Sequence, residues 1–338
     1  MHPAEVSRHP ERTPPTPAAY RAAAARIAPY VRRTPVLRAT ADGRPVAFKL
    51  EHLQVTGVFK IRGALNALLE NRPADPPRMG GLPSRVGGSR PPSPLAVPPS
   101  PPGVVTASGG NHGLGVATAA RWLGVPATVF VPATVPEVKA RRIAAAGAEV
   151  VKTGSVYAEA ELAAREFAAR DRLYYVHAYD DPAVVAGQGT VGLEILEDIP
   201  DCDAVAVPVG GGGLLAGVTG AIAPVQVVGV EPEGCPTLHA AAAAGEPVEV
   251  GADSVAASAL GASRAGDLAL AAYRAYGVAL ALVSDAQIVA ARDRLWEEFR
   301  LAVEPAAATV FAAWLSGQVP GGNPCLVLSG ANADWIPA

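Results

Sequence analysis

The stretch AVAVPVGGGGLLAGVTGAIAPVQVVGV, residues 204–230, contains no charged residue and is long enough to cross a membrane. However, Pro208, Pro224 and the four consecutive glycines at 210–213 make a continuous helix unfavourable. The stretch is better explained as a strand, a glycine loop, a short helix and a second strand. This order predicts a buried part of a soluble α/β protein.

Strand and helix alternate along most of the remaining chain. Expected strands cover residues 45–52, 103–108, 126–132, 148–154, 204–209 and 226–231. Expected helices cover residues 18–31, 60–71, 111–124, 135–147, 156–171 and 284–299. The last of these begins with a capping box, Ser284 and Gln287. The alternation predicts mainly parallel sheets with helices on both faces, which bind ligands at the carboxyl ends of their strands.

The composition limits the classes of function. The chain has 338 residues, enough for one large domain or two smaller ones, and a net charge of −3. This charge gives no general attraction to nucleic acid or to acidic membranes. The cysteines are few and odd in number, which fits a reducing compartment, and the N-terminus lacks the apolar core of a secretory signal. We therefore expect a cytoplasmic protein without a nucleic-acid or membrane partner.

Two segments lack any regular periodicity. Residues 1–16 are polar and rich in proline, so we expect a disordered tail. Residues 72–103 are dominated by proline and glycine. A structureless loop of this length is uncommon inside a compact domain. We therefore expect an exposed insertion or linker, which costs little closure entropy.

Lys60 stands in unusual surroundings. Only four of the 28 basic residues are lysines, and this one follows a glycine-bearing turn and lies between Phe59 and Ile61. A charge gains little from water in such a place. Arginine, whose pKa exceeds about 12, cannot act as a neutral amine, whereas a desolvated lysine can. Lys60 is therefore the candidate catalytic residue.

The four glycines at 210–213 lie between an expected strand and an expected helix. Consecutive backbone N–H groups and the positive end of a helix together form a phosphate site. A competing interpretation is that 211–216 matches the dinucleotide motif G-x-G-x-x-G/A, with Glu231 ending the next strand as the ribose-binding acid. Taken alone, this pattern indicates an NAD-dependent oxidoreductase, but it leaves Lys60 without a role.

A second glycine-bearing loop, TASGGNHGLG, covers residues 106–115 and also begins where an expected strand ends. Ser108, Asn111 and His112 supply short polar groups around a glycine pair that begins at Gly109. Backbone N–H and hydroxyl groups in this arrangement suit a carboxylate. We therefore expect the loop to bind the acid group of a substrate.

These loops, Lys60 and a late hydroxyl, Ser329, together resemble one class of protein, the fold type II pyridoxal 5′-phosphate (PLP) enzymes. The resemblance is to the serine/threonine dehydratase and serine racemase family. Matching segments are RRTPVL, TGVFKIRGA, SGGNHG, DDPAVVAGQGT, VPVGGGGLLAG, VGVEP, VEPAAA and SGANAD. The resemblance implies two domains with open twisted sheets of the tryptophan synthase β type. The large, PLP-binding domain would comprise residues 17–71 and 180–338, and the small domain residues 104–179.

The resemblance implies a role for each matching residue. Lys60 would carry PLP covalently and later remove the α-proton of the substrate. The cofactor would also be held by Phe59, Asn111, Gly210, Gly211, Gly212, Gly213, Leu214, Glu304 and Ser329. The substrate carboxylate would be bound by Ser108, Gly109, Asn111 and His112. For Glu304, an ordinary role as a helix-capping carboxylate stays open.

The resemblance also implies a reaction and an assembly. L-threonine or L-serine would lose its β-hydroxyl and amino groups, giving 2-oxobutanoate or pyruvate plus ammonia. A neutral hydroxyl at Ser329 would not hold the pyridine nitrogen protonated, which favours elimination over transamination. The alternatives are a lyase acting on another β-substituted amino acid and a catalytically silent homologue. A homodimer is expected.

Two positions depart from the family pattern. Racemases carry a second serine where this chain has Gly109, so efficient racemisation is not expected. Members with a divalent cation use the glutamate of VEP, here Glu231, and a second acid, which is replaced here by Thr237. We therefore expect no bound metal, and the histidines and cysteines show no ligand spacing.

Overall fold

The computed structural model describes residues 12–71 and 102–332. The strands are β1 Val36–Ala41, β2 Arg44–Lys49, β3 Val104–Ala107, β4 Ala127–Val131, β5 Glu149–Lys152, β6 Tyr174–Tyr175, β7 Ala204–Pro208, β8 Gln226–Pro232, β9 Ala279–Val283 and β10 Pro324–Val327. The helices are α1 Pro17–Ile27, α2 Lys60–Glu70, α3 Asn111–Leu123, α4 Glu137–Ala145, α5 Tyr157–Asp171, α6 Pro182–Asp198, α7 Gly213–Ile222, α8 Thr237–Ala244, α9 Ala257–Leu260, α10 Asp267–Tyr276, α11 Asp285–Phe299 and α12 Pro305–Leu315, with a 3-10 turn, η1, at Glu51–Leu53.

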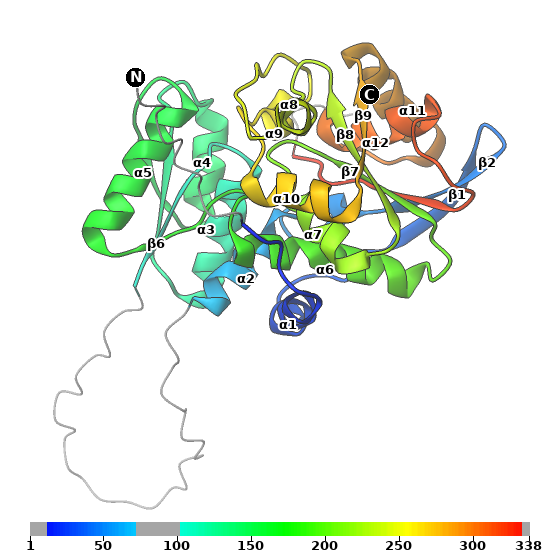
Figure 1. Ribbon diagram of the computed structural model, residues 1–338. Helices are drawn as coiled ribbons and strands as arrows, with labels where there is room; N and C mark the ends of the chain where they lie inside the picture. The colour runs from blue at the N-terminus through cyan, green and yellow to red at the C-terminus, as the bar shows by residue number, and fades with distance from the viewer. Residues whose placement is uncertain (1–11, 72–101, 333–338) are drawn as a thin grey trace, which may run out of the picture.

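The described strands form two sheets, which lie on opposite sides of the molecule in Figure 1. The large sheet has the order β1-β2-β10-β7-β8-β9, and the small sheet has the order β5-β4-β3-β6. Every strand pair is parallel except β1 with β2. The predicted α/β class with mainly parallel sheets is therefore confirmed.

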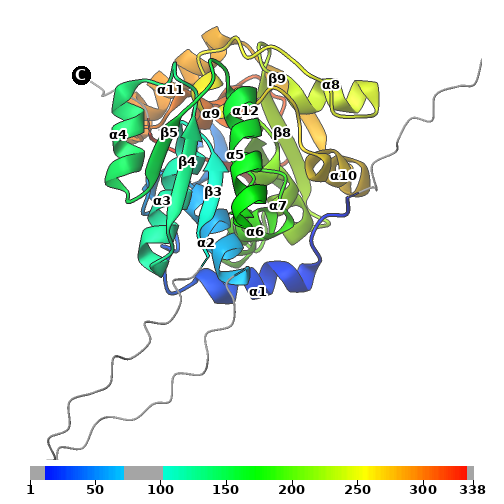
Figure 2. The ribbon, with the colours of Figure 1, turned by 90° about the vertical axis from the view of Figure 1, so that its left-hand side faces the viewer.

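Helices cover both faces of each sheet, as predicted. In β7, Ala204 and Ala206 face a cluster that includes α11 and α12, whereas Val205 and Val207 face α6, α7 and α10. This period of two is the pattern of a strand buried on both faces. The small sheet packs against α5 on one face and against α2, α3 and α4 on the other. Figure 2 shows α5 running across this sheet.

Two local features differ from the sequence analysis. The hairpin of β1 and β2 was not predicted, although Asp42 and Gly43 both have positive φ (49° and 72°), as an Asp-Gly hairpin turn requires. Helix α1 was expected to reach Val31 but ends at Ile27, because Pro29 has no N–H to continue it. The capping box of Ser284 and Gln287 is confirmed.

The small-sheet strands all lie inside the predicted small domain, residues 104–179, but the division into two domains stays a prediction.

Thr16, which was expected from the sequence to lie in the tail, caps α1 by accepting from the Ala19 N–H at 3.3 Å. The rest of the tail up to residue 11 and residues 72–101 of the insertion lie outside the described residues. No helix within 12–71 or 102–332 is both long and apolar enough to span a membrane, residues 204–230 included.

Candidate active site

The four-glycine loop lies between β7 and α7, at the carboxyl end of a central strand. Gly212 has a φ of 85°, which favours glycine. A Cβ atom built on Gly210 would lie 2.9 Å from Leu260 Cα, and one on Gly213 would lie 2.7 Å from the carbonyl oxygen of Tyr179. The loop therefore has no room for side chains, and no side chain among the described residues caps the start of α7. Such a site fits a phosphate group.

Lys60 is the first residue of α2, and the turn before it is tied to the segment that follows β10. Val58 forms a bridge with Gly330, and the Phe59 N–H donates to the carbonyl oxygen of Ser329 at 3.2 Å. Ser329 is itself buried, as is Leu214 at the start of α7. Lys60 and Ser329 were expected from the sequence to share one site, and these contacts bring their segments together.

The Lys60 amine lies in a largely desolvated position. Its Nζ atom donates to the carbonyl oxygen of Ala178 at 2.9 Å and lies 5.3 Å from the centre of the Phe59 ring. Burial lowers the pKa of Lys60 to about 8, and the nearby Glu304 carboxyl only partly opposes this effect. The amine can therefore be neutral near physiological pH, as a proton acceptor must be.

Asn111 joins the two sides of the site. It begins α3, and its Nδ2 donates to Glu304 Oε1 at 3.1 Å, while its Oδ1 accepts from Asn332 Nδ2 at 3.0 Å. Glu304 precedes α12 and is almost fully buried, and this burial raises the pKa of its carboxyl. Glu304 does not cap α12 with its side chain, so the capping role left open by the sequence is not the one observed.

The loop at 108–112 follows β3 and opens α3. The Ser108 hydroxyl accepts from the Gly110 N–H at 3.2 Å. His112 Nε2 lies 3.1 Å from the carbonyl oxygen of Val176, and burial lowers the pKa of the ring to about 3. The neutral ring therefore donates to Val176, and the backbone at the start of α3 is the part of His112 that can bind an anion. The substrate-binding roles of this loop stay predictions.

Glu231 and Thr237 form a separate buried cluster beside the glycine loop. Glu231 accepts from the Leu238 N–H at 2.7 Å and the His239 N–H at 2.8 Å, and the Thr237 hydroxyl lies 3.0 Å from its Oε1. The same hydroxyl lies 2.5 Å from the carbonyl oxygen of Gly210. Both carboxyl oxygens of Glu231 therefore have hydrogen-bond partners within the protein. The described part of the chain holds no group of three His, Cys, Asp or Glu arranged for a metal.

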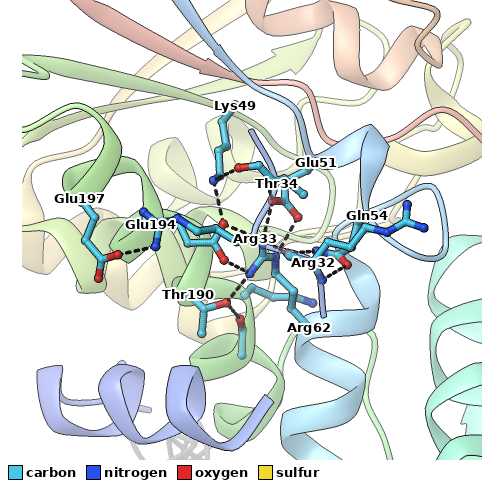
Figure 3. A network of polar contacts seen from close by, with 12 residues as sticks. Arg32, Arg33, Thr34, Lys49, Glu51, Gln54, Arg62, Thr190, Glu194 and Glu197 are labelled. Carbon is cyan, nitrogen blue, oxygen red and sulfur yellow. Dashed lines mark hydrogen bonds and ion pairs between the residues drawn. The ribbon is translucent and has the colours of Figure 1, made fainter. Parts of the chain in front are cut away.

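A buried polar network supports the start of α2 (Figure 3). The fully buried Arg62 donates to Glu51 Oε2 at 2.8 Å and to Glu194 Oε1 at 2.7 Å. Lys49 Nζ lies 2.7 Å from Glu194 Oε2 and donates to the carbonyl oxygen of Thr34 at 2.7 Å. These pairs join β2, η1, α2 and α6. Because an unpaired buried charge is costly, they fix α2 relative to its neighbours.

Three residues of the site and its support were not predicted from the sequence: Ala178, Asn332 and Arg62. Ala178 acts through its backbone, so its side chain carries no signal. Asn332 and Arg62 lie inside the matching segments SGANAD and TGVFKIRGA, where they received no role. Arg62 lies between Ile61 and the apolar residues at 64–65 of α2, and this position was a usable signal, because a buried charge requires partners.

The site as a whole fits PLP. A partly buried lysine of lowered pKa can bind an aldehyde, and a loop that excludes every side chain can hold a phosphate at a helix start. With two mainly parallel sheets around them, these features define a fold type II PLP-dependent enzyme.

Comparison with known proteins gives the same result. The family model described as "Pyridoxal-phosphate dependent enzyme" matches residues 27–330. The chain belongs to this family, in the threonine dehydratase and serine racemase group. The NAD-dependent interpretation of the glycine loop is therefore set aside.

The relatives include both lyases and racemases. An L-threonine ammonia-lyase of Geobacter sulfurreducens is 39% identical over 298 residues, which cover 86% of this chain and 68% of the relative. A serine racemase of Arabidopsis thaliana is 32% identical over 324 residues, covering 91% and 90%. The crystal structure of a threonine deaminase from the organism abbreviated T.th. aligns with a TM-score of 0.81 at 34% identity, covering 96% of this chain and all of that one.

Proposed function

We propose that this protein is an ammonia-lyase that converts L-threonine, L-serine or both to 2-oxobutanoate or pyruvate plus ammonia. The relatives named as L-threonine ammonia-lyase and threonine deaminase support this reaction. The relatives named as serine racemases make racemisation the alternative to test. By family resemblance the enzyme would be a homodimer, which light scattering on the purified protein would test.

Gly109 is the observation that favours elimination over racemisation. Racemisation needs a proton donor on the face of the α-carbon opposite to Lys60, and family racemases carry a serine at this position. Glycine has no group to donate, and a Cβ atom built on Gly109 would lie 2.5 Å from Val135 Cγ2. A side chain at 109 would therefore require Val135 to move, and residue 109 itself supplies no proton to the second face.

Lys60 would carry the proton chemistry. When bound, PLP supplies an aldehyde that captures the substrate amine and a conjugated ring that withdraws electrons from the α-carbon. Lys60 Nζ, as a neutral amine, accepts the α-proton, and the β-hydroxyl then leaves with its bonding electrons. The lowered pKa of Lys60, about 8, suits this role because the amine need not be stripped of a strongly held proton.

The other residues would bind and orient the reactants. The start of α3, with Ser108 and the backbone of Asn111 and His112, would hold the substrate carboxylate. The Asn111 side chain would face the cofactor ring, with Glu304 fixing its orientation through two hydrogen bonds. Ser329, a buried neutral hydroxyl, would face the pyridine nitrogen.

A substrate panel tests the proposal. The enzyme with PLP is incubated with L-threonine, L-serine, D-serine and other β-substituted L-amino acids, and keto acid, ammonia and D-amino acid are measured. We expect equimolar keto acid and ammonia from a β-hydroxy amino acid, and D-serine formation at least about tenfold slower than pyruvate formation. If D-serine forms faster than pyruvate, the protein is a racemase instead. If keto acid forms faster from an amino acid with another β-substituent, it is a lyase for that amino acid instead.

A further inference from the structure

The segment between β6 and α6 contacts the Lys60 amine. Lys60 Nζ donates to the carbonyl oxygen of Ala178 at 2.9 Å. The same peptide unit, between Ala178 and Tyr179, offers its N–H to His177 Nδ1 at 3.2 Å. One rigid, planar peptide group therefore connects the histidine ring to the lysine amine.

The His177 ring closes a turn. Its Nδ1 accepts from the N–H groups of both Tyr179 and Asp180, at 3.2 and 2.9 Å. An asparagine or aspartate oxygen accepts from the same two backbone positions in side-chain turns and helix caps. Because Nδ1 is an acceptor here, the ring proton must be on Nε2.

Neighbouring elements hold the ring in this orientation. His177 Nε2 lies 3.6 Å from Glu161 Oε1 of α5, and the Tyr179 ring meets the imidazole edge to face at 4.6 Å between centres. Burial lowers the pKa of His177 to about 4, while Glu161 opposes this and Arg165, Lys60 and Arg12 add to it. The ring is therefore neutral, and its Nδ1 lone pair is available, over the range in which Lys60 titrates.

We infer that His177 is a positioning residue, whose Nδ1 holds the Ala178 peptide group so that its carbonyl oxygen orients the Lys60 amine. A neutral amine that donates one N–H to a fixed acceptor has its lone pair constrained to the remaining directions. The turn thus aims the lone pair that accepts the substrate proton. This inference rests on the proposed function only through the role of Lys60 as the base.

Matched variants separate positioning from packing. His177→Phe keeps an aromatic ring but has no acceptor, whereas His177→Asn loses the ring but places Oδ1 where Nδ1 was. We expect kcat for the best substrate to fall at least about tenfold in His177→Phe with KM within about threefold, because only the proton transfer is misaligned. We expect His177→Asn to recover kcat to within about threefold of the original enzyme.

Two measurements on the cofactor-free protein complete the test. Hydrogen exchange at the Tyr179 and Asp180 amides should be faster in His177→Phe and protected in His177→Asn. The ¹⁵N chemical shifts of His177 in the unaltered chain should show the Nε2–H tautomer, a result that needs no variant to fold. These readouts hold even if no substrate of the panel is turned over, so failure of the proposed function would be distinguished.

Three outcomes would overturn the inference. The first is an Nδ1–H tautomer in the unaltered chain. The second is an unchanged kcat in His177→Phe although its two amides exchange quickly. The third is an equal loss of kcat in both variants although the amides of His177→Asn remain protected, since the ring itself would then be required.

Discussion

Lys60 illustrates how burial creates a reactive group. An exposed lysine is almost fully charged at neutral pH, but burial here lowers the pKa of its amine to about 8. The Ala178 carbonyl oxygen remains the acceptor for its N–H group. The amine is thus available as a base without leaving the protein interior.

We predict that kcat rises with pH as Lys60 loses its proton. Below about pH 8 the neutral fraction of the amine increases about tenfold per pH unit, and it levels off above this value. The measurement is kcat for L-serine or L-threonine between about pH 6 and 9.5. The control is Lys60→Ala, whose activity should be lower by at least about 10³-fold. A kcat that stays flat across this range would show that Lys60 deprotonation does not limit turnover.

Because Val135 lies close to Gly109, we predict how substitutions at these two positions change activity and the formation of D-serine. Gly109→Ser alone should lose most activity, because its Cβ would meet Val135 Cγ2 at 2.5 Å. Val135→Ala should relieve this contact, so the double variant should recover turnover and form D-serine from L-serine. The control is Gly109→Ala with Val135→Ala, which has the Cβ but no hydroxyl. Equal D-serine formation in both double variants would refute a role for the hydroxyl.

At the scale of elements, the polar network of Arg62 fixes α2 against α6 and η1. Arg62 and Glu51 are removed from water and the Glu194 side chain is only 14% exposed, so the Arg62 charge depends on its two partners. Breaking such a pair leaves an uncompensated charge in the interior, which is far more costly than losing a surface pair.

We predict that Arg62→Met lowers the free energy of unfolding by about 3–5 kcal/mol, because Glu51 and Glu194 lose their shared partner. The matched control is Arg170→Met, which removes an exposed pair with Asp171 and should change the free energy by less than about 1 kcal/mol. Urea denaturation of each variant measures both values. Similar values for the two variants would mean that the network contributes no more than a surface pair.

Helices and strands could be predicted from the sequence where their periodicity and capping residues agree with the fold. The helix at 284–299 has both periodicity and a capping box, and it forms as α11. The β1–β2 hairpin was missed although its Asp42-Gly43 turn was readable, because polar Arg38 and Thr40 weaken the apolar pattern of an edge strand. Contacts such as Lys60 with Ala178, 118 positions apart, could not be predicted, since backbone acceptors carry no residue code.

At the scale of the whole molecule, the site is shared between the two sheets. Asn111 follows a strand of the small sheet and contacts Glu304, which packs with the large one, while Ala178 follows β6 and contacts Lys60. Contacts across such a boundary are lost whenever the two parts separate, even if each keeps its own secondary structure.

We therefore predict that urea inactivates the enzyme before it unfolds it. Activity should disappear at a lower urea concentration than the helical signal in far-ultraviolet circular dichroism, because small displacements of the two parts already misplace the reacting groups. PLP is kept in excess so that loss of cofactor does not produce the difference. Coincident midpoints would indicate that the site and the fold are lost in one transition.

The place of β10 in the large sheet has a consequence for biosynthesis. This strand, Pro324–Val327, lies between β2 and β7, and the residues after it contact the turn before Lys60. A nascent chain on the ribosome therefore carries β1 and β2 without their partner in the large sheet until β3 to β9 and the helices between them have been translated. The turn before Lys60 gains its contacts with Ser329 and Gly330 only after β10 has left the exit tunnel, so the lysine site is completed late in synthesis.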